Sequence, residues 1–131
     1  MLKQFDIHTQ QQSMHNITGQ LHSVVDESGV HNGICLVFCP HTTAGITINE
    51  NADSDVQRDF LLGLNTAYPD RREFRHAEGN SSAHLKSSAV GPEQMLIIEH
   101  GRLLLGRWQG VYFCEFDGPR QRTFFVKTIE G

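Results

Sequence analysis

The sequence has no long apolar run, because no stretch approaches the roughly 20 apolar residues that a membrane-spanning helix needs. Its N-terminal segment, MLKQFDIHTQQQSMHNITGQ, also lacks the apolar centre that a secretory signal carries. These two absences predict a cytoplasmic protein that has no membrane partner.

An excess of positive charge is missing as well. The formal net charge is −4 and the pI is near 6.0, so the chain offers no broad basic surface for the phosphate backbone of a nucleic acid. The one tight basic cluster, formed by Arg71, Arg72 and Arg75, is interpreted as a solvated loop face. We therefore expect no nucleic-acid partner.

Cysteine is scarce, and the three cysteines cannot all pair within one chain. Cys35 and Cys39 lie in a strand-like run that would place them about 13 Å apart, which is too far for a disulfide. No CxxC pair and no four-ligand Cys/His pattern occurs, which excludes a structural zinc finger. The commonest nucleotide, dinucleotide and serine-hydrolase motifs, GxxxxGK[ST], GxGxxG and GxSxG, are also absent.

The chain has the length of one domain, with 131 residues of which 38% are hydrophobic. We expect strands at 3–9, 12–17, 33–40, 95–99, 103–116 and 123–129, the fifth interrupted by a bulge or bend at Gly106 or Gly110. Helices are expected from Thr18 to a stop at Gly29, over 53–67 and over 81–89, with an exposed loop at 70–80. The run 33–40 is apolar throughout, which predicts a central strand covered on both faces. This irregular order favours an α+β fold with a mixed or antiparallel sheet and about three helices.

Eight histidines are the most unusual feature of the composition. Five of them lie at no ligand-like spacing and are assigned surface or structural roles: His8, His15, His22, His31 and His100. His41 differs because it directly follows the apolar run, where loops on a rigid scaffold expose site residues. Thr42 and Thr43 offer hydroxyl groups at the same place, and Gly45 offers a backbone that a ligand can approach closely. A polar turn that satisfies its own hydrogen bonds explains the segment equally well.

A second polar group, Asn49, Glu50 and Asn51, stands just before the helix expected at 53–67. Asparagine at a helix N-terminus either caps the helix or meets an anionic ligand. Glu50 could act as a base, bind a metal ion or face solvent.

The segment RHAEGNSSAHL places His76 and His84 on either side of Gly79 and Asn80. Three neutral imidazoles and a water form a familiar open catalytic zinc site. His41 would complete such a set if it folded against His76 and His84. The spacing is not that of the helical HExxH pair, so metal binding by these three histidines is a hypothesis.

Two C-terminal segments complete the polar inventory. Trp108 and Gln109 lie within an expected strand, where an indole is more often core than a stacking platform. Asp117 and Arg120 belong to a turn-like sequence that is typical of a hairpin loop. A buried aspartate beside histidines would instead orient an imidazole or carry a proton.

Four motifs, HTTAGITINEN, RHAEGNSSAH, GRLLLGRWQG and EFDGPRQR, follow one another as in the YjbQ family, which the sequence resembles over essentially its whole length. The resemblance implies an α+β fold, a homotrimer and a weak, secondary thiamine-phosphate synthase activity. It also implies a metal-binding or catalytic cluster at His41, His76, His84 and Asp117. Two positions depart from the family pattern: Glu93 stands where a serine is usual, and Arg107 stands where a threonine is usual, beside Trp108.

The implied reaction joins a pyrimidine diphosphate to a thiazole phosphate and expels pyrophosphate, which requires cations and amide donors around the leaving group. A divalent ion, zinc or magnesium, on the three histidines would contribute to that role, with Asp117 and Glu50 as catalytic carboxylates. The expected contacts to this small phosphorylated substrate are Thr42, Thr43, Asn49, Gly79, Asn80, Trp108, Gln109 and Arg120.

Two other interpretations stay open. One is a metal-dependent hydrolase or phosphatase, in which Asp117 or Glu50 activates water. The other is a non-catalytic trimeric module that binds a ligand in the same pocket.

Overall fold

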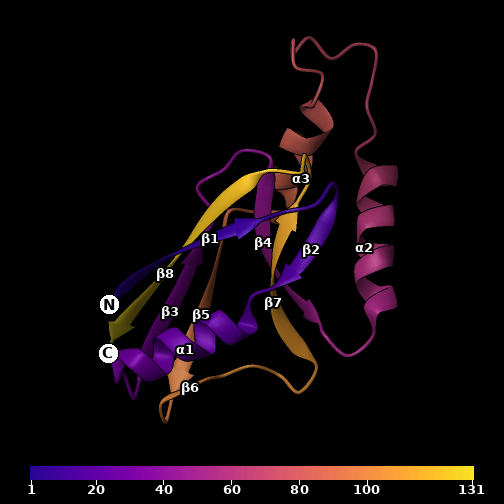
Figure 1. Cartoon of the computed structure of the whole chain (residues 1–131). Helices are drawn as coiled ribbons and strands as arrows, with labels where there is room; N and C mark the ends of the chain where they lie inside the picture. Colours follow the sequence, from indigo (N-terminus) through magenta and orange to yellow (C-terminus); the bar gives the residue numbers. More distant parts are fainter.

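The computed structural model describes all 131 residues, as two antiparallel sheets and three helices (Figure 1). The strands are β1 (Leu2–His8), β2 (Ser13–Asn16), β3 (Gly33–Phe38), β4 (Ala44–Glu50), β5 (Glu93–Glu99), β6 (Arg102–Leu103), β7 (Gln109–Glu115) and β8 (Gln121–Glu130). The helices are α1 (Thr18–Ser28), α2 (Ser54–Ala67) and α3 (Ser81–Val90). The predicted α+β class and the number of helices are confirmed. No helix is both long and apolar enough to cross a membrane.

The larger sheet has the strand order β1-β8-β3-β5-β6, with β3 at its centre. One face of β3 is buried through Cys35 and Val37, which pack in the main core with residues of β5, β8 and α1. The other face carries Ile34, Leu36 and Phe38, which are only partly covered. The prediction that this strand is covered on both faces is therefore wrong for the single chain. The outward side chains are apolar, which suggested burial, but no other element of the chain packs on them.

The smaller sheet has the order β2-β7-β4 and lies between two apolar layers. Val111 and Phe113 of β7 pack in the main core, together with side chains of α1 and of the larger sheet. Tyr112 and Cys114 point to the opposite face, where they form a smaller core with Ala83 of α3 and with side chains of α2. This arrangement fixes the start of α3 against the sheet.

Local signals explain where the helices begin and end. Gly29 ends α1 with a φ of 69°, a left-handed conformation that glycine adopts without strain. The Asp53 carboxylate accepts a hydrogen bond from the Asp55 backbone N–H at 2.9 Å and so caps α2. The stop at Gly29 was expected from the sequence, and α2 agrees with the helix expected over 53–67. No residue of α2 is buried in the single chain, and the helix lies at the margin of the molecule in Figure 1.

Two segments differ from the sequence prediction. The run 44–50, for which no strand was expected, is strand β4, whose first residues the smaller sheet buries while its polar end is only partly covered. The expected strand 103–116 is two strands, β6 and β7, joined by the loop 104–108. Trp108 lies in that loop with 53% of its surface exposed, so its interpretation as core is wrong.

Candidate functional site

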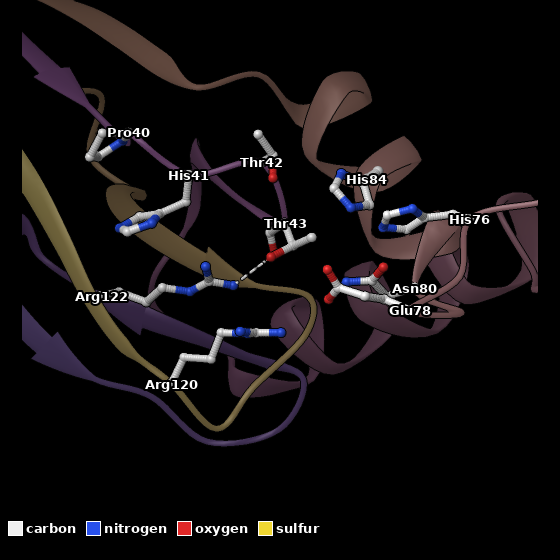
Figure 2. A pocket seen from close by; sticks show the side chains of 10 residues that line it. All are labelled: Pro40, His41, Thr42, Thr43, His76, Glu78, Asn80, His84, Arg120 and Arg122. Atoms are coloured by element: carbon white, nitrogen blue, oxygen red, sulfur yellow. Dashed lines mark hydrogen bonds between the residues drawn. The ribbon is translucent and has the colours of Figure 1, made fainter.

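A polar cleft of about 370 Å³ opens where the β3–β4 loop, the start of α3 and the β7–β8 turn meet. Figure 2 shows the side chains that line it, none of them hydrophobic: Pro40, His41, Thr42, Thr43, His76, Glu78, Asn80, His84, Arg120 and Arg122. The structure thus brings together seven predicted site residues: His41, Thr42, Thr43, His76, Asn80, His84 and Arg120. Gly79 and Asp117 lie directly beside the cleft, next to Asn80.

The floor of the cleft is a buried ion pair between Arg122 of β8 and Glu115 of β7. Arg122 donates through Nε to Glu115 Oε1 at 2.8 Å and through Nη2 to Glu115 Oε2 at 2.5 Å. The same Nη2 donates to the Thr43 hydroxyl at 2.8 Å. The guanidinium is therefore fixed in place, while its Nη1 makes no hydrogen bond within the chain and is available to a ligand.

Glu115 is fully buried and accepts four hydrogen bonds. Besides Arg122, the Thr9 hydroxyl donates to it at 2.6 Å and the Asp117 backbone N–H donates to it at 3.0 Å. Burial by itself would raise the pKa of Glu115, but the bonds from Arg122 and Thr9 hold that pKa below its ordinary value. Glu115 is thus a structural carboxylate that positions Arg122 and does not exchange protons at neutral pH.

Asp117 connects the β7–β8 turn to the start of α3. Its Oδ2 accepts from Asn80 Nδ2 at 2.7 Å and from Arg120 Nη2 at 2.8 Å. Burial acts to raise the pKa of Asp117, but the hydrogen bonds from Asn80 and Arg120 keep it below its usual value. The carboxylate is ionised at neutral pH, and it positions Arg120 more readily than it accepts a proton.

His41 is anchored by the backbone of β8. Its Nε2 lies 3.0 Å from the Thr123 N and 3.1 Å from the Thr123 O, so either tautomer uses Nε2 within the chain. Burial and the charge of Arg122 lower the pKa of His41, which is neutral at pH 7. Only its Nδ1 is left for a ligand in the cleft.

His76 and His84 lie together on the other side of the cleft. Their rings meet edge to face with centroids 5.1 Å apart, and Figure 2 shows both apart from the His41 ring. No group of three or more His, Cys, Asp or Glu side chains is placed to hold a metal ion. A single chain therefore does not fit the predicted three-histidine site, although His76 and His84 form a pair.

The first turn of α3 faces the cleft through Asn80 and His84. Asn80 stands at the N-cap position, yet its side chain makes no capping hydrogen bond, because its Nδ2 is directed to Asp117. The N–H groups of Ser81 and Ser82 thus have no acceptor in the chain. Such a helix end attracts anions.

The remaining predicted site residues, Asn49, Glu50, Trp108 and Gln109, lie at the opposite end of the smaller sheet. Asn49 and Glu50 end the seven-residue strand β4, whose length puts them about 20 Å from the cleft. Glu50 pairs with Gln109 across the sheet, and Arg107 lies 4.8 Å over the Trp108 ring. Within one chain, these four residues are not part of the cleft.

Sequence reasoning missed Arg122, Glu115, Thr9 and Glu78. Arg122 and Glu115 both belong to the segment EFDGPRQR, and Glu115 lies between two apolar residues, Cys114 and Phe116, so a charge at that position was the available signal. The ion pair of Arg122 and Glu115 joins two strands of different sheets, β7 and β8, which meet at the turn 116–120, and sequence periodicity does not give that arrangement.

Comparison with known proteins agrees with this fold. A family described as UPF0047 protein YjbQ-like matches residues 3–131. The chain belongs to the YjbQ family. It is 54% identical to UPF0047 protein YugU of Bacillus subtilis over 131 residues, covering 98% of this chain and 99% of that protein. It is 50% identical to UPF0047 protein MJ1081 of Methanocaldococcus jannaschii, over 98% of this chain and 94% of that protein.

Solved structures of YjbQ-family proteins share the whole architecture. A protein of the yjbq/upf0047 family from Clostridium acetobutylicum superposes with a TM-score of 0.95 at 53% identity, covering 97% of this chain and 99% of that one. A YbjQ-like protein of unknown function from Sulfolobus solfataricus gives a TM-score of 0.95 at 30% identity, covering 100% and 97%. The resemblance inferred from the four motifs is confirmed at the level of family and fold.

Proposed function

We propose that the cleft binds the phosphate groups of a small phosphorylated substrate and that the chain has a weak thiamine-phosphate synthase activity. One observation carries the proposal: a cleft without hydrophobic lining gathers Arg120 and Arg122 beside the open N-terminus of α3. Each arginine is held by a carboxylate and keeps its Nη1 free of any partner in the chain.

The proposed reaction fits such a donor set. A ring nitrogen of the thiazole forms a C–N bond to the pyrimidine methylene carbon, while the C–O bond to the diphosphate breaks and its electron pair leaves with pyrophosphate. The negative charge that develops on the leaving group is stabilised by guanidinium and backbone N–H donors that are already in position. Arg122 and the N–H groups of Ser81 and Ser82 would supply these donors.

His41, as a neutral imidazole, and His84 would contribute hydrogen-bonding groups from opposite walls of the cleft. A divalent ion, zinc or magnesium, stays a prediction, and no step of the proposed reaction depends on one. Asp117 would hold Arg120 against the diphosphate. We assign Glu50 no step, because it lies at the far end of β4.

The test is an assay of thiamine phosphate from a pyrimidine diphosphate and a thiazole phosphate, with pyrophosphate measured in parallel. We expect equal amounts of both products from the wild type and a large loss in His84→Ala. His22→Ala is the matched control, because His22 is exposed on α1, outside the cleft. Release of inorganic phosphate alone would indicate a phosphatase, and thermal stabilisation without any product would indicate a binding module.

We further propose that the outward face of the larger sheet joins the copies of a homotrimer. Ile34 lies between Ile129 and Ile97 in register, and Leu36 lies beside Met95. Met95 is 65% exposed and Ile97 57% exposed. A contiguous apolar sheet face of this kind is typical of a contact between subunits.

A cytoplasmic location is part of the same proposal. It is supported by the three cysteines, which are buried and free.

A further inference from the structure

A second cavity, of about 260 Å³, adjoins the cleft, and Asn80 lines both. Its walls include Lys86 and Ala83 of α3, Asn65 of α2 and Phe116. The proposed binding of phosphate groups makes no use of this cavity, and sequence reasoning gave Lys86 no role.

Lys86 is a buried ammonium group that has too few partners. Only 5% of the residue is exposed, and its Nζ donates one hydrogen bond, to Asn65 Oδ1 at 2.5 Å. Gln12 and Asn65 exchange two amide hydrogen bonds, of 2.9 and 2.7 Å, which hold this acceptor in place. Lys86 forms no ion pair, so two of its three N–H donors have no acceptor in the chain. Burial of an ammonium in this state is costly and is compensated when a ligand supplies the missing acceptor.

Asn80, which lines the same cavity, carries an acceptor that lacks a donor. Asn80 Oδ1 is buried without any hydrogen-bond partner, because the other half of the amide is bound to Asp117. The carboxylate of Asp70 stands at the wall as well. A buried orphan oxygen of this kind is rare in folded proteins and is satisfied by an N–H or O–H group from outside the chain.

The charges in the cavity decide which ligand fits. The cavity is lined by one cation, Lys86, and two carboxylates, Asp70 and Asp117, and so a second phosphate group would be repelled. A neutral group with an acceptor for Lys86 and a donor for Asn80 satisfies both unpaired groups. Ala83 and Phe116 supply an apolar wall against which a flat ring can pack.

We propose that the second cavity binds an amino-substituted nitrogen heterocycle, the neutral head of the molecule whose phosphates occupy the cleft. A ring nitrogen accepts from Lys86 Nζ, and the exocyclic amino group donates to Asn80 Oδ1 and the Asp70 carboxylate. The continuity of head and phosphates rests on the proposed function, whereas recognition of the heterocycle rests on Lys86 and Asn80 alone.

The experiment measures binding by calorimetry with two separate probes, an aminopyrimidine alcohol without phosphate and inorganic pyrophosphate. In Lys86→Met, the dissociation constant of the alcohol should rise at least about tenfold, the loss expected when a hydrogen bond from a charged donor is removed. The affinity for pyrophosphate should stay within about twofold of the wild type. Asp70→Asn is the second variant: its side chain is exposed, so it preserves the fold even if Lys86→Met does not, and it should weaken the alcohol several-fold.

The outcomes separate the two proposals. If the alcohol fails to bind the wild type, or binds both variants as tightly as the wild type, the heterocycle site is refuted, whatever pyrophosphate does. An equal loss of both probes in the two variants also refutes it, because the effect would then be general. If pyrophosphate does not bind while the alcohol binds and depends on Lys86, the proposed function fails and the heterocycle site stands.

Discussion

Replacing Glu115 with glutamine keeps the shape of the side chain and removes the charge that holds Arg122. The fully buried carboxylate accepts from Thr9, from the Asp117 backbone and from two nitrogens of Arg122. A glutamine can accept through one oxygen only, and its amide N–H groups would meet the N–H donors of Arg122 or Asp117. Arg122 would then be a buried charge without a counter-ion.

Loss of one partner of a buried ion pair costs about 3–5 kcal/mol, a large part of the roughly 5–15 kcal/mol that stabilises a typical domain. We therefore expect Glu115→Gln to lower the free energy of unfolding by about 3 kcal/mol or more at pH 7, measured by urea denaturation. The matched control is Glu73→Gln, which removes the partner of Arg71 from an exposed pair and should leave the unfolding curve unchanged.

A double replacement, Glu115→Gln with Arg122→Met, sharpens the test. Because it leaves no unpaired charge, it should cost clearly less than the sum of the two single replacements. A loss of less than about 1 kcal/mol in Glu115→Gln, or additive effects in the double variant, would refute the reasoning that this pair supports the cleft.

Four further predictions follow from the same structure. In the thiamine-phosphate assay, His41→Ala and His84→Ala should each lose most activity, whereas unchanged rates would place the chemistry outside the cleft. Because the pKa of Glu115 is lowered in the folded state, its contribution to stability is complete above the ordinary value of 4.5 and is lost as the pH falls through the folded pKa. Melting temperatures should therefore drop below about pH 4.5 by more in the wild type than in Glu115→Gln, and parallel curves would contradict this. Sedimentation should show trimers that Ile97→Lys dissociates and that Ser23→Lys, on the exposed face of α1, does not; a wild-type monomer would end the trimer proposal. Elemental analysis tests the metal prediction: because one chain brings only His76 and His84 together, any zinc or magnesium in the purified protein should depend on that pair and be lost in His84→Ala, and an equal metal content in both would exclude the histidines as ligands.

Much of the fold could be predicted because its signals are local. Gly29 marks the end of α1, and Asp53 marks the start of α2, since each acts on its own backbone or its nearest neighbours. The strand β4 was not predicted, because its polar end resembles a loop that carries site residues. This segment is a strand because it pairs with β7, which lies some 60 residues later in the chain.

The candidate site was predicted in part, for the same reason. His41, His76 and His84 were found because histidines follow a buried strand and flank a helix start, and the structure places all three around one cleft. Asn49 and Glu50 were grouped with them because they are close in sequence, yet an extended strand carries them away from the cleft. Arg122 was missed because its neighbours in sequence, Gln121 and Thr123, are polar, so nothing local marks it as buried; the approach of β8 to β7 of the other sheet brings it to Glu115.

The proposed function depends on the binding of phosphate groups in the cleft at the start of α3. Titration of isotope-labelled protein with inorganic pyrophosphate, followed by NMR of the backbone amides, tests it most directly. We expect saturable shifts at Ser81, Ser82 and Thr43, with Asn49 and Gln109 unchanged. Shifts confined to Asn49 and Gln109, or the absence of saturable shifts anywhere, would contradict it.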